Sequence, residues 1–343
     1  MDQRIRTTIF LLMMLAGGHV HGQDPQFSQF YAAPLYLNPA FAGSTQVTRI
    51  GLNYRNQWPA IDASYVTYTA YADHFFVDAN SGVGLLIMSD REGLAGLRNQ
   101  GASLFYAYQL PVSGSWTFRA GGQAGYFFRD LDYSKLVFGD MILPDGTIVP
   151  GGEDFSNYTD ANYFDLSFGG LMYNSNLWVG FTGHHVNKPN RSFLQDGSDP
   201  LPVRYSVHAG YRLNLRPGAS GQILGGNVQR SIDLYPAINY RLQGEFMQFD
   251  AGAYIDFQPV IFGVWYRGIP IRKVNDISNN ESVIFSVGFS RDGLNIGYSF
   301  DYTLSQLGIQ SGGAHEISIS YEFFMGNPRK PPRSIREIPC PRL

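Results

Sequence analysis

The sequence predicts an all-β fold: a transmembrane, antiparallel β-barrel of the outer membrane with about 14 strands. Three observations predict it. Only 15% of the 343 residues are charged, against roughly 25% in an ordinary soluble domain. Aromatic residues contribute another 15%, yet no apolar run reaches the roughly 18 residues of a transmembrane helix. Long segments alternate apolar and polar residues, which is the period of a strand between two environments.

The same composition excludes other classes of protein. A disordered chain would carry fewer aromatic residues and more net charge. A nucleic-acid-binding protein would be basic, whereas the formal net charge is −3 and no basic block is present. A soluble β-sandwich stays open as an alternative, because its inward-facing residues would alternate as well. Low charge and long strands favour the barrel over the sandwich.

Residues 1–22 have the pattern of a secretory signal peptide. Arg4 and Arg6 supply a positive start, and Ile9–Ala16 is an unbroken apolar run that is too short to span a bilayer. Small residues follow, which predicts cleavage before Gln23. The mature protein is therefore expected outside the cytoplasm.

The segment 23–46 precedes the first strand and is predicted to be a periplasmic, plug-like segment. Asn38 marks a turn, because a residue before proline avoids the helical region, and Gly43 permits a backbone bend. We expect its aromatic side chains to plug the lumen or to contact a partner, while packing alone is the alternative. The residues assigned to this role are Phe27, Phe30, Tyr31, Tyr36, Asn38, Pro39, Phe41 and Gly43.

Alternating segments follow one another through residues 47–324, which we predict to be the barrel. In Leu294–Thr303, for example, Ile296 and Tyr298 lie on one face and Ser299 on the other. Most segments exceed the five or six residues common in soluble strands and match the roughly nine to eleven that cross a bilayer. The predicted strands are 47–57, 64–76, 82–90, 98–110, 115–129, 162–173, 176–187, 203–215, 231–241, 246–257, 260–267, 281–291, 293–303 and 313–324.

The connections alternate between short and long, as they do in bacterial outer-membrane barrels with short periplasmic turns and longer external loops. Two connections break this pattern, since 216–230 is long where a short turn is expected and 242–245 is short where a loop is expected. The tight connections are 111–114, 174–175, 258–259 and 291–292. The longer ones are 130–161, 188–202, 268–280 and 304–312.

The last strand is followed by a tail, 325–343, that is rich in proline and arginine. Its prolines prevent it from continuing a helix or a strand ladder. We expect it in the periplasm, where it can contact other components. Cys340 is the only cysteine, so an intramolecular disulfide is excluded, and the sequence assigns this thiol no role.

Several motifs, spread in order over nearly the whole mature chain, resemble those of the PorP/SprF family of type IX secretion system membrane proteins of Bacteroidetes. They begin with QDPQFSQFY at 23–31 and PLYLNPAFAG at 34–43. The further motifs are YRNQW at 54–58, FDLSFGG at 164–170, GFTGHH at 180–185 followed by Pro189, GYSFDYTLS at 297–305 and SGGAHEI at 311–317.

This resemblance implies an outer-membrane protein of a Gram-negative bacterium that assists secretion or surface attachment of cargo with C-terminal sorting domains, including gliding-motility adhesins. The implied partners are outer-membrane lipid, the cargo C-terminal domains and the periplasmic ring components of the machinery. An outer-membrane barrel transporter or porin for small or hydrophobic solutes is the alternative function. Lumen-facing polar residues would suit either.

The few carboxylates within strands predict the inner face of the barrel. Charge on the lipid face is unfavourable at mid-depth, so these side chains are expected to face the lumen. They are Asp165, Asp250, Asp256 and Asp301.

No catalytic, cofactor-binding or metal-binding residues are predicted. The sequence contains no nucleophile elbow, no phosphate-binding loop and no Cys-x-x-Cys motif, so we expect no enzyme activity. His184 and His185 are adjacent and face opposite sides of a strand, and His208 lies on another strand. A zinc site needs three or four convergent ligands, which these histidines do not provide.

Overall fold

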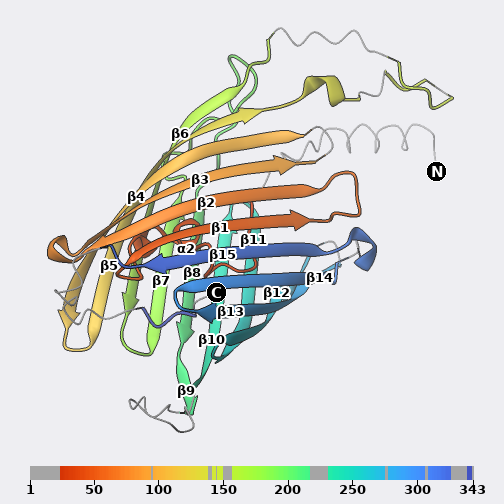
Figure 1. Ribbon diagram of the computed structural model, residues 1–343. Coiled ribbons are helices and arrows are strands. Elements are labelled where there is room, and N and C mark those ends of the chain that lie inside the picture. Colours follow the sequence, from red (N-terminus) through yellow and green to blue (C-terminus); the bar gives the residue numbers. More distant parts are fainter. Residues whose placement is uncertain are drawn as a thin grey trace.

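The computed structural model shows a wall of tilted strands wound around the N-terminal segment (Figure 1). It describes residues 24–93, 96–137, 141–143, 145–149, 157–216, 231–274, 277–305, 308–325 and 338–341. The expected signal peptide, 1–22, lies outside these residues. Among them no helix has both the length and the apolar character needed to cross a membrane.

The strands carry the alternating pattern that the sequence predicts, and short helical turns join some of them. The strands are β1 (Thr48–Gln57), β2 (Tyr65–Phe76), β3 (Ser81–Glu92), β4 (Leu97–Ser113), β5 (Trp116–Asp130), β6 (Ala161–Tyr173), β7 (Leu177–His184), β8 (Arg204–Tyr211), β9 (Leu213–Arg216), β10 (Ile232–Gln243), β11 (Phe246–Phe257), β12 (Val260–Val274), β13 (Ile277–Arg291), β14 (Leu294–Thr303) and β15 (Ala314–Phe323). The helical turns are α2 (Pro34–Leu37), η1 (Pro39–Phe41), η2 (Val77–Ala79), η3 (Tyr133–Lys135) and η5 (Ile309–Ser311).

The strands close into a barrel. Consecutive strands pair antiparallel, and β1 pairs β15 along its full length, from Thr48 opposite Phe323 to Gln57 opposite Ala314. Strands β8 and β9 both pair β10 and so form one position in the wall. The described strands therefore occupy 14 positions, which confirms the predicted outer-membrane barrel. Because the first and last strands pair, the described sheet has no free edge strand, as a hydrocarbon environment requires.

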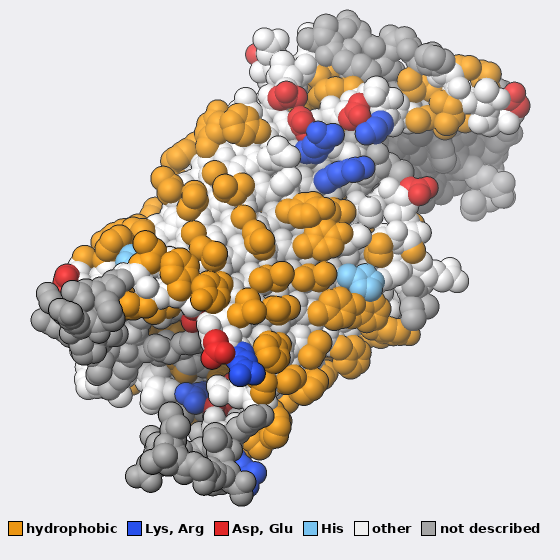
Figure 2. Space-filling view, viewed as in Figure 1, with side chains coloured by type: hydrophobic (Ala, Val, Ile, Leu, Met, Phe, Trp, Pro, Cys, Tyr) orange, Lys and Arg blue, Asp and Glu red, His pale blue; other side chains and the backbone are white. Residues whose placement is uncertain are grey.

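Each strand turns one face to lipid and the other to the lumen. On β14, Ile296 and Tyr298 are 41% and 40% exposed. Ser299 and Asp301, on the opposite face of the same strand, are both buried. Figure 2 shows the result on the face in view: a broad belt of hydrophobic side chains, with Lys, Arg, Asp and Glu gathered toward its two ends. Many of the aromatic and aliphatic side chains of the strands thus cover the outside of the barrel.

The two ends of the barrel differ, and we call them the turn end and the loop end. The turn end carries the connections 77–80, 114–115, 174–176, 258–259 and 292–293. The loop end carries the connections 58–64, 93–96, 131–160, 185–203, 244–245, 275–276 and 304–313, of which residues 94–95, 138–140, 144, 150–156, 275–276 and 306–307 lie outside the described residues. In outer-membrane barrels the short turns face the periplasm.

Some strand limits differ from the sequence-based prediction. The segment 268–280 was expected as a polar connection, but β12 and β13 continue through most of it. Their pairing there is irregular, with register shifts after Arg267 and Ile269. Such polar strand extensions beyond the bilayer look like loops by composition. In contrast, β7 ends at His184, three residues early, because His185 adopts a left-handed conformation with φ of 58°. Most of 216–230 lies outside the described residues.

Candidate functional site: an occupied barrel lumen

The segment before β1 fills the interior of the barrel, and we call residues 24–47 the lumen segment. Helical turn α2 begins with Pro34, whose fixed φ suits the first position of a helix. It ends at Leu37, because the next residue, Asn38, is extended and precedes a proline. The Asn38 side chain then accepts the backbone N–H of Ala40 at 2.9 Å and so caps η1. At Gly43, φ is +66°, which favours glycine and turns the chain toward β1.

The lumen segment extends from one end of the barrel to the other. At the loop end, the Asp24 carboxylate lies 3.0 Å from Arg204 and 2.7 Å from His185. At the turn end, the Gly43 backbone N–H donates to Asp73 at 2.7 Å, and Asp73 also pairs with Arg49 at 2.9 Å. Ion pairs of Asp24 thus fix the segment at the loop end, and a hydrogen bond to the charged Asp73 fixes it at the turn end.

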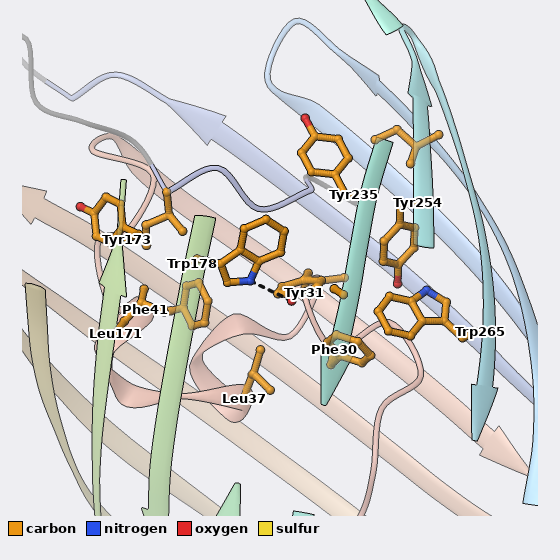
Figure 3. Close-up of a cluster of buried hydrophobic side chains, with 14 of the residues drawn as sticks. Phe30, Tyr31, Leu37, Phe41, Leu171, Tyr173, Trp178, Tyr235, Tyr254 and Trp265 are labelled. Carbon is orange, nitrogen blue, oxygen red and sulfur yellow. Dashed lines mark hydrogen bonds between the residues drawn. The ribbon is translucent and has the colours of Figure 1, made fainter. Parts of the chain in front are cut away.

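An aromatic cluster joins the lumen segment to one side of the wall (Figure 3). The Phe30 ring lies 4.7 Å from the Trp265 ring of β12, nearly perpendicular to it. The Trp178 indole N–H of β7 donates to the Tyr31 hydroxyl at 2.9 Å. The rings of Tyr31 and Tyr254 are also in edge contact, 6.5 Å apart. Edge-to-face pairs of this kind stabilise beyond simple area burial.

A second apolar cluster joins the segment to the opposite strands, β2 to β6. Leu35 and Ala42 pack there against wall residues that include Leu86, Phe105 and Phe127. All of these side chains are at most 5% exposed. Apolar side chains of the wall thus face inward on this side, where the lumen segment rather than water covers them.

The eight residues predicted to plug the lumen or contact a partner all belong to this arrangement. Tyr36 is half-buried and the other seven are buried. The Tyr36 hydroxyl accepts from Arg204 at 3.0 Å, and burial raises the pKa of Tyr36 to about 12. Asn38, which is 0% exposed, donates from its amide to the carbonyls of Gly170 and Phe181 at 3.1 and 3.2 Å. It thereby joins η1 to the paired strands β6 and β7.

The wall is shaped to admit η1. A methyl group built at Gly121 of β5 would lie 2.4 Å from the backbone nitrogen of Ala40 and from the carbonyl carbon of Pro39. Real side chains do not approach backbone atoms so closely. Glycine at this position therefore lets the main chain of the lumen segment lie directly against the wall.

Two of the predicted lumen carboxylates lie in one network of buried charges. Asp301 pairs with Arg55 at 2.9 Å and with Arg267 at 3.2 Å. Arg267 pairs in turn with Asp250 at 2.7 Å, and Asp250 with Arg241 at 3.1 Å. Each carboxylate accepts from two guanidinium groups, an arrangement that compensates the cost of burying the charges.

The other two predicted carboxylates lie elsewhere. Asp165 is 1% exposed and bonds to Nδ1 of His185 at 2.8 Å. Burial opposes protonation of His185, but Asp24 and Asp165 raise the pKa of His185 to about 9. Burial likewise disfavours an ionised Asp24, but His185 and Arg204 hold the pKa of Asp24 well below its usual value. Asp256 is half-buried and lies opposite Asp233 of β10.

The cationic partners Arg241 and Arg267, and the anion Glu316, were missed in the sequence-based prediction. Glu316 accepts the backbone N–H groups of Ser28 and Gln29. Strand parity was the available signal, because Arg267 lies on the same strand face as Trp265, two residues before it. A charged residue on the face opposite the lipid-facing ones belongs inside the barrel.

The histidines contact the lumen segment or the wall instead of converging on one point. His208 stacks on Phe41 at 5.6 Å and contacts Asn38 at 3.3 Å. His185 bridges Asp24 and Asp165. Within the described ranges, no group of three or more His, Cys, Asp or Glu side chains could hold a metal ion.

At the loop end a cavity of about 460 Å³ lies above the start of the lumen segment, and we call it the vestibule. Asp24 and Gln26 contribute to its lining from the lumen segment. The wall contributes three carboxylates and several aromatic rings, including Asp90, Glu92, Glu281, Trp58 and Phe246. The vestibule is therefore a concave surface, rich in acidic residues, at the loop end of the barrel.

Comparisons with known proteins found a matching family and several similar solved structures. The model of the family described as type IX secretion system membrane protein PorP/SprF matches residues 20–321. No curated protein matches the chain. Among solved structures, the chain is similar to the KdgM porin, with 8% identity, a TM-score of 0.36 and coverage of 80% of this chain and 99% of that one. The chain is also similar to CdiB from Acinetobacter baumannii, with 8% identity, a TM-score of 0.42 and coverage of 81% of this chain and 60% of that one. A third similar structure is the TodX monoaromatic hydrocarbon channel deltaS2 mutant, with 12% identity, a TM-score of 0.44 and coverage of 85% of this chain and 94% of that one.

Proposed function

The chain belongs to the PorP/SprF family of type IX secretion system membrane proteins, and from that premise we propose that it holds secreted cargo at the cell surface instead of conducting it. As a family member with a porin-like barrel, the chain is an outer-membrane component of the secretion machinery. Retention of cargo by this component is the part that we propose. The cargo would be proteins with C-terminal sorting domains, including surface adhesins in gliding bacteria.

The observation that carries this proposal is the occupied lumen. The lumen segment crosses the whole barrel, and Phe27, Phe30 and Phe41 in its middle are at most 4% exposed. A folded or extended polypeptide could pass only if this segment left. Leaving would break the buried bonds that Glu316 makes with the segment and that Asn38 makes with the wall, which is unfavourable without replacement partners.

The occupied lumen also argues against the alternative, a transporter or porin for small or hydrophobic solutes. Apart from the vestibule, the cavities described along the lumen segment have volumes of about 20 to 40 Å³. Such volumes hold a few water molecules but no metabolite. A solute could therefore enter the vestibule without crossing the membrane.

We assign the cargo contact to the loop end and the contact with periplasmic ring components to the turn end. The loop end offers the vestibule, a concave surface with Asp90, Glu92 and Glu281. A cargo domain with a basic protrusion would complement it, and charge complementarity of this kind mainly sets specificity and association rate. The turn end faces the periplasm, where the ring components lie.

The test is binding of purified cargo C-terminal domains to the barrel in lipid nanodiscs. We expect binding by the unmodified protein and at least about tenfold weaker binding by Glu92→Lys, which introduces a positive charge into the vestibule. Asp292→Lys, at an 88% exposed side chain of the turn end, is the matched control and should bind normally. In parallel, planar bilayers should show no steady conductance. Steady conductance without cargo binding would support the transporter instead.

A further inference from the structure

The end of the chain returns to the mouth of the barrel at the turn end. Ile338 is 8% exposed and joins the aromatic cluster that contains Tyr31 and Phe41. Cys340 packs against the same cluster, and Pro339 and Pro341 are buried. Residues 338–341, which we call the terminal segment, are therefore part of the packed interior although they follow the last strand.

The surroundings of the terminal segment have the composition of a peptide-binding site. The lumen segment provides an apolar floor through Tyr31, Pro34 and Phe41. The wall provides a polar rim through Asn295 and Ser320 of the last two strands, together with Arg49 and Glu322. Apolar pockets with a polar rim suit an extended peptide, and two prolines pre-set the extended backbone at a low entropic cost.

We propose that the turn-end mouth is a binding site for a short, apolar, proline-containing peptide, and that the terminal segment is its resident ligand and acts as a releasable latch. The lumen segment is held by buried carboxylates and amide bonds, such as those of Glu316 and Asn38. The terminal segment packs against the cluster through the side chains of Ile338 and Cys340. Its release uncovers Tyr31 and Phe41 while the bonds of the lumen segment to the wall stay intact.

The tether explains why the site is filled. Strand β15 ends at Phe323, at the turn end, so the chain that leads to Ile338 starts beside the mouth. A short tether gives its ligand an effective concentration in the millimolar range, which excludes a free peptide of modest affinity. Occupation of the site by a peptide added from solution therefore requires that the latch is weakened first.

The first experiment measures binding of a fluorescent peptide with the sequence of residues 337–343, in which serine replaces cysteine. The protein is the full chain in detergent, either unmodified or as Ile338→Asp, which puts a charge where the cluster needs an apolar side chain. We expect at least about tenfold tighter binding to Ile338→Asp than to the unmodified protein. The same peptide with aspartate in place of its isoleucine should bind neither.

Two results would overturn the latch. One is equal binding of the peptide to both proteins, or no binding to a folded Ile338→Asp barrel. The other is failure of Ile338→Asp to give the heat-modifiable folded form, because a releasable latch must leave the barrel intact. Either result is independent of cargo binding, so the proposed function would be unaffected.

A second experiment locates the terminal segment in the unmodified tail. Cys340 is the only cysteine of the sequence, so one added cysteine can form only one intramolecular disulfide. Thr45→Cys and Ser320→Cys place it on the two sides of the pocket. We expect a disulfide under mild oxidation from at least one of them and none from Ser305→Cys at the vestibule. Absence of a disulfide from both pocket positions would contradict the assignment.

Discussion

The carboxylate of Glu316, on the last strand of the barrel, accepts the backbone N–H of Ser28 at 2.6 Å. The same carboxylate accepts the N–H of Gln29 at 2.9 Å and lies 3.2 Å from Arg55. The lumen segment and the last strand thus meet inside the barrel through residues that are 288 positions apart in sequence. Since the wall binds main-chain groups through a buried charge, the lumen segment is part of the fold and its displacement would leave Glu316 without these partners.

Replacing Glu316 by glutamine should therefore destabilise the barrel. The amide keeps one acceptor but places N–H donors against backbone N–H groups, and it removes a negative charge beside Arg55. We expect a loss of about 3 kcal/mol in the free energy of unfolding. Urea titration of the heat-modifiable folded form measures it. Glu245→Gln, at an exposed turn, is the matched control. Equal stability of the two variants would mean that the lumen segment is not bound through Glu316.

Adjacent glycines of β5 offer a test of how closely the lumen segment contacts the wall. Gly121→Ala puts a methyl group 2.4 Å from main-chain atoms of Pro39 and Ala40, so either the wall or the segment must shift. We expect the free energy of unfolding to fall by about 1–3 kcal/mol. Gly122→Ala is the matched control, because its nearest neighbour outside the strand is the Phe168 ring at 3.7 Å. Thermal unfolding in detergent compares the two, and a more severe effect of Gly122→Ala would contradict the close approach.

Asn38→Asp preserves the shape of a fully buried side chain but removes its amide donors. The carbonyls of Gly170 and Phe181 would then face a carboxylate instead of an N–H. Repulsion between these oxygens and the cost of burying an unpaired charge should destabilise the barrel by about 3 kcal/mol. Asn157→Asp, on an exposed loop residue, should have little effect. Urea titration checks both, and unchanged stability of Asn38→Asp would show that the amide does not join η1 to the wall.

The sequence sufficed for the wall and for its faces because both follow from a period of two. In Leu294–Thr303 the apolar positions face lipid and the polar ones face the lumen. Hairpin pairing is local, so the order of strands around the barrel follows the order along the chain. The predicted strand ends were wrong where a polar composition suggests a loop but the residues still pair as strands, as at the extensions of β12 and β13.

The interior could be predicted only in part. The lumen aspartates were selected by strand parity, and the short turn 258–259 would also have set Arg267 opposite Asp250. Glu316, in contrast, lies 288 residues from Ser28, so this contact could not be inferred from spacing. The path of the lumen segment could not be predicted from the sequence either, because Asn38 and Gly43 predict bends in the backbone but not the direction of those bends. Ile338 gives no local signal either: an isolated apolar residue in a proline-rich tail is ordinary, and only the closed barrel creates the cluster that it joins.

The ion pairs at the loop end should make stability depend on pH. The pKa of His185 is about 9 in the folded barrel, above the ordinary value of about 6.5, so folding favours the protonated imidazole. The stabilisation is fully present below pH 6.5 and is lost as the pH rises through 9. At pH 6 the free energy of unfolding of the unmodified protein should exceed that of His185→Gln by up to about 3 kcal/mol, and at pH 9.5 little of this difference should remain. Asp24→Asn should move the loss to lower pH, because it removes the carboxylate 2.7 Å from the ring. Thermal unfolding in detergent across this range measures the difference, and a difference between the unmodified protein and His185→Gln that does not vary with pH would show that His185 does not ionise between these carboxylates.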